Sequence, residues 1–436
     1  MSDDQIGPII LVLLALISAA HLLGHFFARL RQPRVIGEIA AGILLGPTLL
    51  GRLAPNLSAS LFSGSVSTSH AIHDVMGFIY AMGLLLLMFV SGTETRRLFG
   101  REDRRQVAWL TSVGTGVPFL IALLLVPLFP MQKLVGRAGQ NGALVLVLGI
   151  AVAVTSIPVI SRIFHDLGVM HTRFARLVLG VAVIEDIALW GVLAIATALA
   201  KSAVLPHAEI LRHIAITLVY FAVGLTIAPP LLRRLSHARW NLLATASPLG
   251  YLVAVMLAFC GSAALLHVNL VFAAFLAGYG VARDRESFST AIDSLARFSF
   301  AFFIPLYFLI VGFRVDLGRD YSFAMLAVFL AIACGIKLIS VGLGARMAGF
   351  RGLDILNLAV ATNARGGPGI VLASVAYDAG IVNSQAFTTL VLLAILTSQA
   401  AGAWLEFVLR RGWPLLSPAP PGSTAASEPD TDLQAA

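Results

Sequence analysis

LVLGVAVIEDIALWGVLAIATALA, residues 177–200, is 24 residues long and contains only two charged side chains, Glu185 and Asp186. An α-helix rises 1.5 Å per residue, so about 20 apolar residues cross the hydrocarbon core of a bilayer. The stretch therefore predicts a transmembrane helix with two acids near mid-membrane. An ionisable side chain at that depth costs at least about 2.5 to 3.5 kcal/mol and is typical of a pathway for ions or protons.

The composition of the whole chain is that of a membrane protein. Of its 436 residues, 58% are hydrophobic and 12% are charged, and its mean hydropathy is +0.90. A soluble globular domain carries about 25% charged residues. Cys260 and Cys334 lie in apolar runs, which argues against a disulfide framework or a cysteine metal site. We attribute the net charge of +8 to loops that face anionic lipid, and we expect no nucleic-acid partner.

Apolar stretches predict thirteen transmembrane helices, and the distribution of basic residues orients them. With the N-terminus outside and the C-terminus cytoplasmic, 21 of the 30 Lys and Arg residues fall in cytoplasmic loops and 7 in outer loops. This bias follows the positive-inside rule, and we expect a multi-pass protein of the cell membrane. Arginines after the first apolar run indicate a retained first helix rather than a signal peptide. The predicted helices are 6–28, 35–50, 74–92, 107–129, 142–164, 174–200, 210–232, 247–266, 268–282, 297–313, 323–345, 353–378 and 386–409.

Two basic residues, Lys337 and Arg365, remain inside the predicted membrane segments. They lie near the centres of the eleventh and twelfth helices, at the depth of Asp186 in the sixth. Charged groups in lipid must pair or line a wet cavity. We therefore expect Lys337 to pair with Asp186 or with Glu185.

The fifth and twelfth predicted helices are interrupted at that same depth. TSIP, residues 155–158, contains Pro158, and GGPG, residues 366–369, contains Pro368. Proline removes a backbone donor and glycine weakens a helix, so freed carbonyls and half-helix ends become available where an ion can bind.

The ordinal spacing of the two interrupted helices predicts inverted repeats. The interrupted helices are the fifth and the twelfth, so their positions in the helix order differ by seven. Because seven is odd, equivalent helices of the two halves cross the bilayer in opposite directions. The predicted fold is an all-α polytopic membrane domain, residues 1–413, with two inverted repeats and crossed broken helices. The repeats are residues 1–200 and 244–413, residues 201–243 are a linker helix with its loops, and residues 414–436 form a disordered cytoplasmic tail.

A series of motifs also identifies a family. They are PRVIGEIAAG (33–42), LGP (45–47), the segment 84–92, TS (155–156), ED (185–186), FLAG (275–278), FIPL (303–306), Lys337 and Arg365-Gly366. In this order they resemble the monovalent cation:proton antiporter superfamily, in the branch of NapA-type sodium/proton antiporters and Kef-type potassium efflux transporters.

The resemblance implies a homodimer of thirteen-helix chains. Residues 107–200 and 323–409 would form a core that moves against a dimer panel made of residues 6–92 and 247–313. Asp186 matches the aspartate at which a cation and protons compete, and Thr155 and Ser156 match the unwound segment that adds oxygen ligands. Oxygen donors are what Na⁺ or K⁺ requires, so Asp186 and Thr155 are the expected ligands of the monovalent cation.

The chain departs from the family pattern at two places. Glu185 stands where electrogenic members have Asp, electroneutral members Asn and Kef-like members Gln. Exchange of a second proton by Glu185 or Lys337 would make transport electrogenic, which we favour, whereas Glu185 held in a salt bridge would carry no proton. Gly367-Pro368 follows Arg365 where relatives often have an acid, so we expect Arg365 to be a structural tie.

Two other assignments stay open. Thr155 and Ser156 either bind the cation or only cap the broken helix. Glu38, near the cytoplasmic start of the second helix, either guides ions or has a structural, lipid-facing role.

We expect a transporter rather than an enzyme. Na⁺ is the favoured cation, and K⁺ or Li⁺ stays open. The sequence has no metalloprotease motif and no glycine-rich nucleotide motif, so we expect no cofactor and no nucleotide-binding domain in this chain. The alternatives are a sodium-coupled transporter of an organic anion on a related fold, or a potassium efflux pathway that a separate subunit regulates.

Overall fold

The structure, a computed structural model, describes residues 3–30, 32–56, 66–94, 103–128, 130–201 and 207–417. Within these ranges the regular structure is helical, and the one β contact is an isolated bridge between Val135 and Val382. The elements are α1 Asp3–Arg29, α2 Arg34–Leu45, α3 Leu50–Leu53, α5 Val66–Glu94, α6 Arg104–Thr111, the π-helix η1 Ser112–Gly116, α7 Val117–Leu125, the 3-10 turns η2 Val126–Leu128 and η3 Met131–Lys133, α8 Asn141–Ala153, α9 Ile157–Asp166, α10 Arg173–Lys201, α11 His207–Thr226, α12 Ala228–Ser236, α13 Leu242–Ala246, α14 Pro248–Leu265, α15 Leu270–Val281, the 3-10 turn η4 Ala282–Asp284, α16 Arg285–Ala301, α17 Phe303–Phe313, α18 Phe323–Met347, α19 Leu353–Ala361, α20 Gly366–Asp378 and α21 Ser384–Arg410.

Many of these helices are long and apolar enough to span a membrane. The described residues contain nine such helices, or ten if the bent pair Leu211–Thr226 and Ala228–Ser236 is one span. This confirms the predicted class of all-α polytopic membrane protein, while the count of thirteen stays a prediction. The numbers differ because the fifth and twelfth predicted helices are each split into two short helices, and because the ninth and tenth fall within one stretch, Leu270–Phe313.

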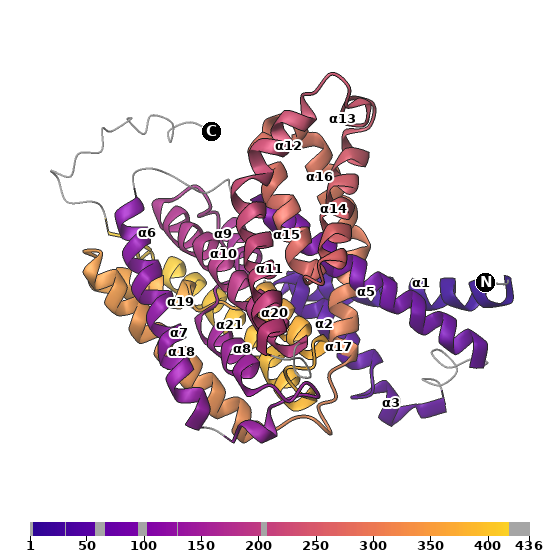
Figure 1. The fold of residues 1–436 in the computed structure, drawn as a ribbon. Helices are drawn as coiled ribbons and strands as arrows, with labels where there is room; N and C mark the ends of the chain where they lie inside the picture. The colour runs from indigo at the N-terminus through magenta and orange to yellow at the C-terminus, as the bar shows by residue number, and fades with distance from the viewer. Residues whose placement is uncertain are drawn as a thin grey trace, which may run out of the picture.

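The helices pack in two groups, which lie side by side in Figure 1. We call α1–α3, α5 and α14–α17 the panel, and α6–α10 with α18–α21 the core bundle. Within the described residues, the extensive helix packing falls inside one group or the other, and α11 packs on both, against α10 and α15. The two groups are therefore joined mainly through side chains at their boundary.

Close helix crossings hold the panel together. A Cβ atom at Gly42 or Gly312 would lie 1.9 to 2.1 Å from a backbone oxygen of the facing helix where α2 crosses α17, and one at Gly92 or Gly278 would lie 2.0 to 2.2 Å away where α5 crosses α15. Glycine is needed at such crossings because any side chain would separate the backbones. In the predicted inverted repeats α2 corresponds to α15 and α5 corresponds to α17. The crossing of α2 with α17 is therefore equivalent to the crossing of α15 with α5.

Two local expectations about loops and ends are wrong. Residues 285–296 were predicted as a cytoplasmic loop, but they form most of the amphipathic helix α16. Residues 414–417 were assigned to the disordered tail, but Leu415 is buried and Asp354 of α19 accepts hydrogen bonds from Ser417. The rest of the predicted tail, residues 418–436, lies outside the described residues. Four of the 21 basic residues assigned to cytoplasmic loops also lie outside them: Arg31, Arg96, Arg97 and Arg101.

Candidate functional site

The two predicted helix breaks are present, but each proline lies after its break. Helix α8 ends at Ala153 and α9 begins at Ile157, with Pro158 in its first turn; α19 ends at Ala361 and α20 begins at Gly366, with Pro368 in its first turn. Proline is tolerated in a first turn because the missing N–H has no intrahelical acceptor there. The prolines thus start the second half-helices. Extended residues precede α9, whereas a turn and Gly366 with a positive φ begin α20.

The two breaks contact each other directly. Ser156 N–H donates to the carbonyl of Ala364 at 2.7 Å, and the Thr155 hydroxyl donates to the carbonyl of Thr362 at 2.5 Å. Gly366 has φ 33°, and a Cβ atom there would lie 2.3 Å from a methyl group of Val159. A side chain at Gly366 would force the breaks apart, so this glycine is required by both backbone conformation and space.

Thr155 and Ser156 are fully buried at this crossing. The Ser156 hydroxyl accepts from the Val159 N–H at 3.3 Å, which caps α9, and the Thr155 hydroxyl spans the two breaks. Each hydroxyl oxygen keeps a lone pair for a further ligand. Capping is therefore present, and it leaves cation binding by these oxygens available.

Arg365 and Lys337 both neutralise the C-terminal end of the half-helix α8. The Arg365 guanidinium donates to the carbonyls of Ala151 and Val152 at 2.7 and 3.0 Å, at the C-terminus of α8, and to Asn363 Oδ1 at 2.7 Å. Lys337 Nζ donates to the carbonyl of Ala153 at 2.5 Å. Cations are favourable there because unpaired carbonyls give a helix C-terminus partial negative charge.

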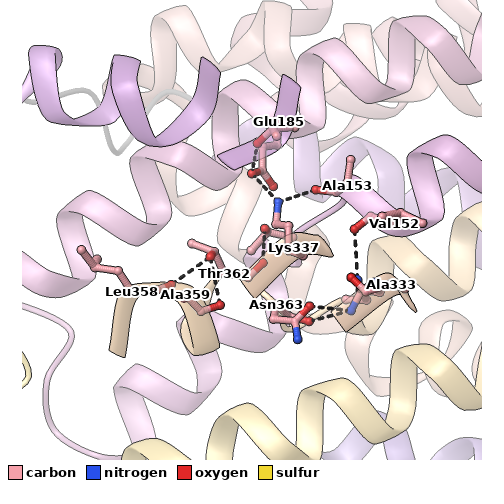
Figure 2. Close-up of polar contacts among 12 residues, drawn as sticks. Val152, Ala153, Glu185, Ala333, Lys337, Leu358, Ala359, Thr362 and Asn363 are labelled. Carbon is pink, nitrogen blue, oxygen red and sulfur yellow. Dashed lines mark hydrogen bonds and ion pairs between the residues drawn. The ribbon is translucent and has the colours of Figure 1, made fainter. Parts of the chain in front are cut away.

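Lys337 also forms an ion pair with Glu185, at 2.8 Å between Nζ and Oε1, and both side chains are 0% exposed. Figure 2 shows Lys337 of α18 reaching between Glu185 of α10 and the carbonyl of Ala153. The Thr115 hydroxyl donates a short hydrogen bond to the same Oε1. Of the two predicted partners of Lys337, the structure places Glu185 in contact.

Thr115 was not predicted from the sequence. It lies in the π-helix Ser112–Gly116, between α6 and α7, and is buried. A π-helix interrupts the regular i to i−4 pattern and is frequent at functional sites. The sequence signal is the pair Gly114 and Gly116 on either side of a hydroxyl in an apolar stretch, a weak signal on its own.

Asp186 differs from the other buried charges. It is 1% exposed, and neither of its carboxylate oxygens has a hydrogen-bond partner in the described part of the chain. Adjacent helical residues point about 100° apart, so Asp186 faces away from the Lys337 pair that Glu185 makes. A buried carboxylate without partners is costly, which points to a ligand or a proton as its missing partner.

A cavity with a volume of about 720 Å³ lies between the panel and the core bundle. Its wall includes Glu38, Arg34 and His21 from the panel and Arg162, Trp190 and Pro368 from the core bundle. Trp190 lies one turn after Asp186 on α10, so the two share a helix face and the cavity reaches within one turn of Asp186. Glu38 is 7% exposed and lines this cavity, rather than facing lipid.

Replacing Thr115 tests whether it positions Glu185. In Thr115→Val we expect the Glu185–Lys337 pair to lose one hydrogen bond and the protein to lose about 1 to 3 kcal/mol of stability, because Oε1 keeps a single donor. Thr115→Ser restores the hydroxyl and is the matched control. Thermal unfolding in detergent measures the difference. Equal melting temperatures for the two variants would show that the hydrogen bond does not hold Glu185.

The fold and the site define a class, a membrane transporter in which two broken helices cross beside buried charges. The chain belongs to the sodium/hydrogen exchanger family of transmembrane proteins, whose family model matches residues 11–411. The family expected from the sequence motifs is confirmed. The chain is therefore a multi-pass cation/proton antiporter.

Individual relatives agree with this family. The chain is 29% identical over 411 residues to the Na(+)/H(+) antiporter NhaS4 of Synechocystis sp., covering 91% of this chain and 96% of the relative. It is 25% identical to the Na(+)/H(+)-K(+) antiporter GerN of Bacillus cereus, covering 88% and 92%. It is also 28% identical to K(+)/H(+) antiporter 1 of Saccharomyces cerevisiae, covering 85% of this chain but only 43% of that relative.

A solved structure matches the fold. The sodium proton antiporter MjNhaP1 of Methanocaldococcus jannaschii superposes with a TM-score of 0.62 at 13% identity, covering 93% of this chain and 98% of that one. At this identity the match supports the arrangement of helices and carries no residue roles.

Proposed function

We propose that this antiporter exchanges a monovalent cation for protons at Asp186 by alternating access, with Na⁺ as the favoured cation and K⁺ or Li⁺ open. One observation carries the proposal. Glu185, Lys337 and Arg365 are all held by protein groups, whereas both oxygens of Asp186 have no partner in the described chain. A buried carboxylate in that condition binds either a proton or a cation, which is the competition an antiporter needs.

The surrounding chemistry suits a small cation. Asp186 supplies negative charge, and the hydroxyls of Thr155 and Ser156 at the helix crossing are candidate oxygen ligands for the same ion. Arg365 and Lys337 occupy the carbonyls at the end of α8, so these carbonyls do not compete for the ion. We assign Arg365 to holding the two breaks together and Lys337 to holding Glu185.

The cavity supplies one access route. In the orientation predicted from the loop charges it opens to the cytoplasm, and Glu38 lies in its wall on the way to Asp186. The core bundle would then move against the panel to expose Asp186 to the other side. Homodimerisation through the panel and an outer N-terminus belong to the same proposal. The relatives named for Na⁺ and for K⁺ support a monovalent cation without selecting one.

Proton release from everted vesicles tests the proposal. Vesicles that contain the protein are acidified, and NaCl, KCl and LiCl are added separately while a pH-sensitive dye reports the internal pH. We expect dequenching with at least one of the three cations and none with choline chloride. A sodium-coupled organic-anion transporter would give no dequenching with any inorganic cation, and that result would reject the proposal.

A further inference from the structure

A second cluster of polar side chains lies away from the cavity, where the panel meets the core bundle. The Tyr80 hydroxyl donates to Asp378 Oδ2 at 2.6 Å, and Arg314 Nη1 donates to Asp378 Oδ1 at 2.8 Å. The Arg314 guanidinium lies 4.0 Å from the centre of the Tyr80 ring. Both oxygens of Asp378 are therefore used, and the three side chains form one unit, which we call the latch.

The latch joins the two helix groups. Tyr80 lies on α5 and Arg314 directly follows α17, both in the panel, whereas Asp378 is the last residue of α20 in the core bundle. The latch thus connects two groups that share little helix-to-helix packing.

A buried contact lies beneath the latch. The hydroxyl of Tyr307 on α17 donates to the Ser374 hydroxyl on α20 at 3.2 Å, and both residues are fully buried. The Tyr307 and Tyr80 rings lie 5.2 Å apart. The contact continues the latch inwards, so the panel and the core bundle are joined by two successive layers of side chains.

The latch lies at the opposite end of the helices from the cavity. Phe308 of α17 and Val371 of α20 are the cavity-lining residues nearest to the latch along these helices, and Arg314 and Asp378 follow them by six and seven residues. Six to seven residues of α-helix span about 9 to 10 Å. The cavity therefore gives access to the region around Asp186 from one end of the helices, whereas the side chains of the latch close the other end.

We propose that the latch is the gate that closes the transport site on the side opposite the cavity. The inference rests on the alternating access proposed above, because movement of the core bundle against the panel must separate Asp378 from Tyr80 and Arg314. The ion pair is partly exposed, with 31% and 40% of the two side chains accessible. A partly exposed pair contributes modestly, so the gate can open in each cycle.

The chain offers a matched control for the gate. Asp316 lies two residues after Arg314 and forms an ion pair of 2.9 Å with Arg52 of α3. Both partners of this pair belong to the panel side. Breaking this pair removes the same kind of contact without releasing the core bundle.

Thiol labelling tests the gate in the full-length protein. In a background with Cys260→Ser and Cys334→Ser, Ser374→Cys reports opening. Arg319→Cys, an exposed position five residues after Arg314, marks the latch side of the membrane. A membrane-impermeant thiol reagent is added from that side to vesicles of known orientation. We expect the reagent to label Ser374→Cys about fivefold faster when Asp378→Asn or Arg314→Gln is also present, which is the change expected from losing one weak contact. We expect Asp316→Asn to leave the labelling rate unchanged.

Equal labelling rates in Asp378→Asn, Arg314→Gln and Asp316→Asn would overturn the gate. Should Asp378→Asn fail to reach the membrane, Tyr80→Phe removes one hydrogen bond and keeps the ring, and it must also increase the rate. The readout does not depend on Asp186, so an unchanged labelling rate rejects the gate alone, whereas full exchange in Asp186→Asn rejects the proposed function alone.

Discussion

Asp186→Asn is expected to reduce cation-driven proton release to the level of vesicles that lack the protein. Asparagine cannot bind or release a proton in the working pH range and carries no charge to attract the cation, so both halves of the exchange are lost. Its size is nearly that of aspartate. Dye dequenching with Na⁺, K⁺ and Li⁺ measures the loss, and Asp316→Asn, on the exposed panel pair, is the control that should keep wild-type exchange.

The same substitution should leave the fold intact. Asp186 accepts no hydrogen bond in the described chain, so asparagine breaks none, and it removes a buried carboxylate that is costly when ionised. We expect a melting temperature equal to or above that of the wild type. Wild-type exchange in Asp186→Asn would remove Asp186 from the mechanism, and loss of exchange together with a large fall in melting temperature would make it a structural residue.

The sequence located the buried charges because hydrocarbon tolerates so few of them. Glu185, Asp186, Lys337 and Arg365 stand out in apolar stretches whatever the details of packing. Their depth follows from the helix rise alone. The choice between Glu185 and Asp186 as the partner of Lys337 depends on the rotation of α10 about its axis, which helix counting does not provide.

The breaks were predicted at the right segments and with the wrong local geometry. Proline suggested an interruption at Pro158 and Pro368, whereas both residues lie in the first turn of a half-helix and the non-helical residues lie before them. The hydrogen bonds of Ser156 and Thr155 to the other break explain this position. Such contacts join residues about 200 positions apart, so local sequence patterns do not contain them.

Thr115 and α16 were missed for different reasons. The hydroxyl of Thr115 is ordinary in an apolar helix, and only its contact with Glu185 gives it a role. Helix α16 carries charged residues that resemble a loop when helices are sought by long apolar runs, although its buried side includes Phe288, Ile292 and Leu295. Amphipathic helices at a membrane surface are visible as period 3.6 patterns rather than as apolar runs.

Removing one partner of the Glu185–Lys337 pair is expected to destabilise the protein strongly, by about 3 to 5 kcal/mol, because the other charge stays buried and unpaired. Glu185→Gln and Lys337→Met each test this by thermal unfolding in detergent. The double variant should lose much less than the sum of the two single losses, since it leaves no unpaired charge. Arg410→Gln, at an exposed pair within α21, should leave the melting temperature unchanged. Additive losses in the double variant would mean that the pair is not a coupled unit.

The double variant also decides the stoichiometry. If Glu185 and Lys337 carry no proton and only hold the half-helix α8, Asp186 exchanges one proton per cation, so the double variant keeps the exchange and neither it nor the wild type responds to an imposed membrane potential. If one of them carries a second proton, exchange becomes one proton per cation, moves no net charge, and no longer responds to the potential. Dequenching by Na⁺ with and without an imposed potential separates these outcomes, because Asp186 and the hydroxyls of Thr155 and Ser156 are unchanged in the variant. A potential-sensitive wild type with an insensitive double variant would assign the second proton to the pair.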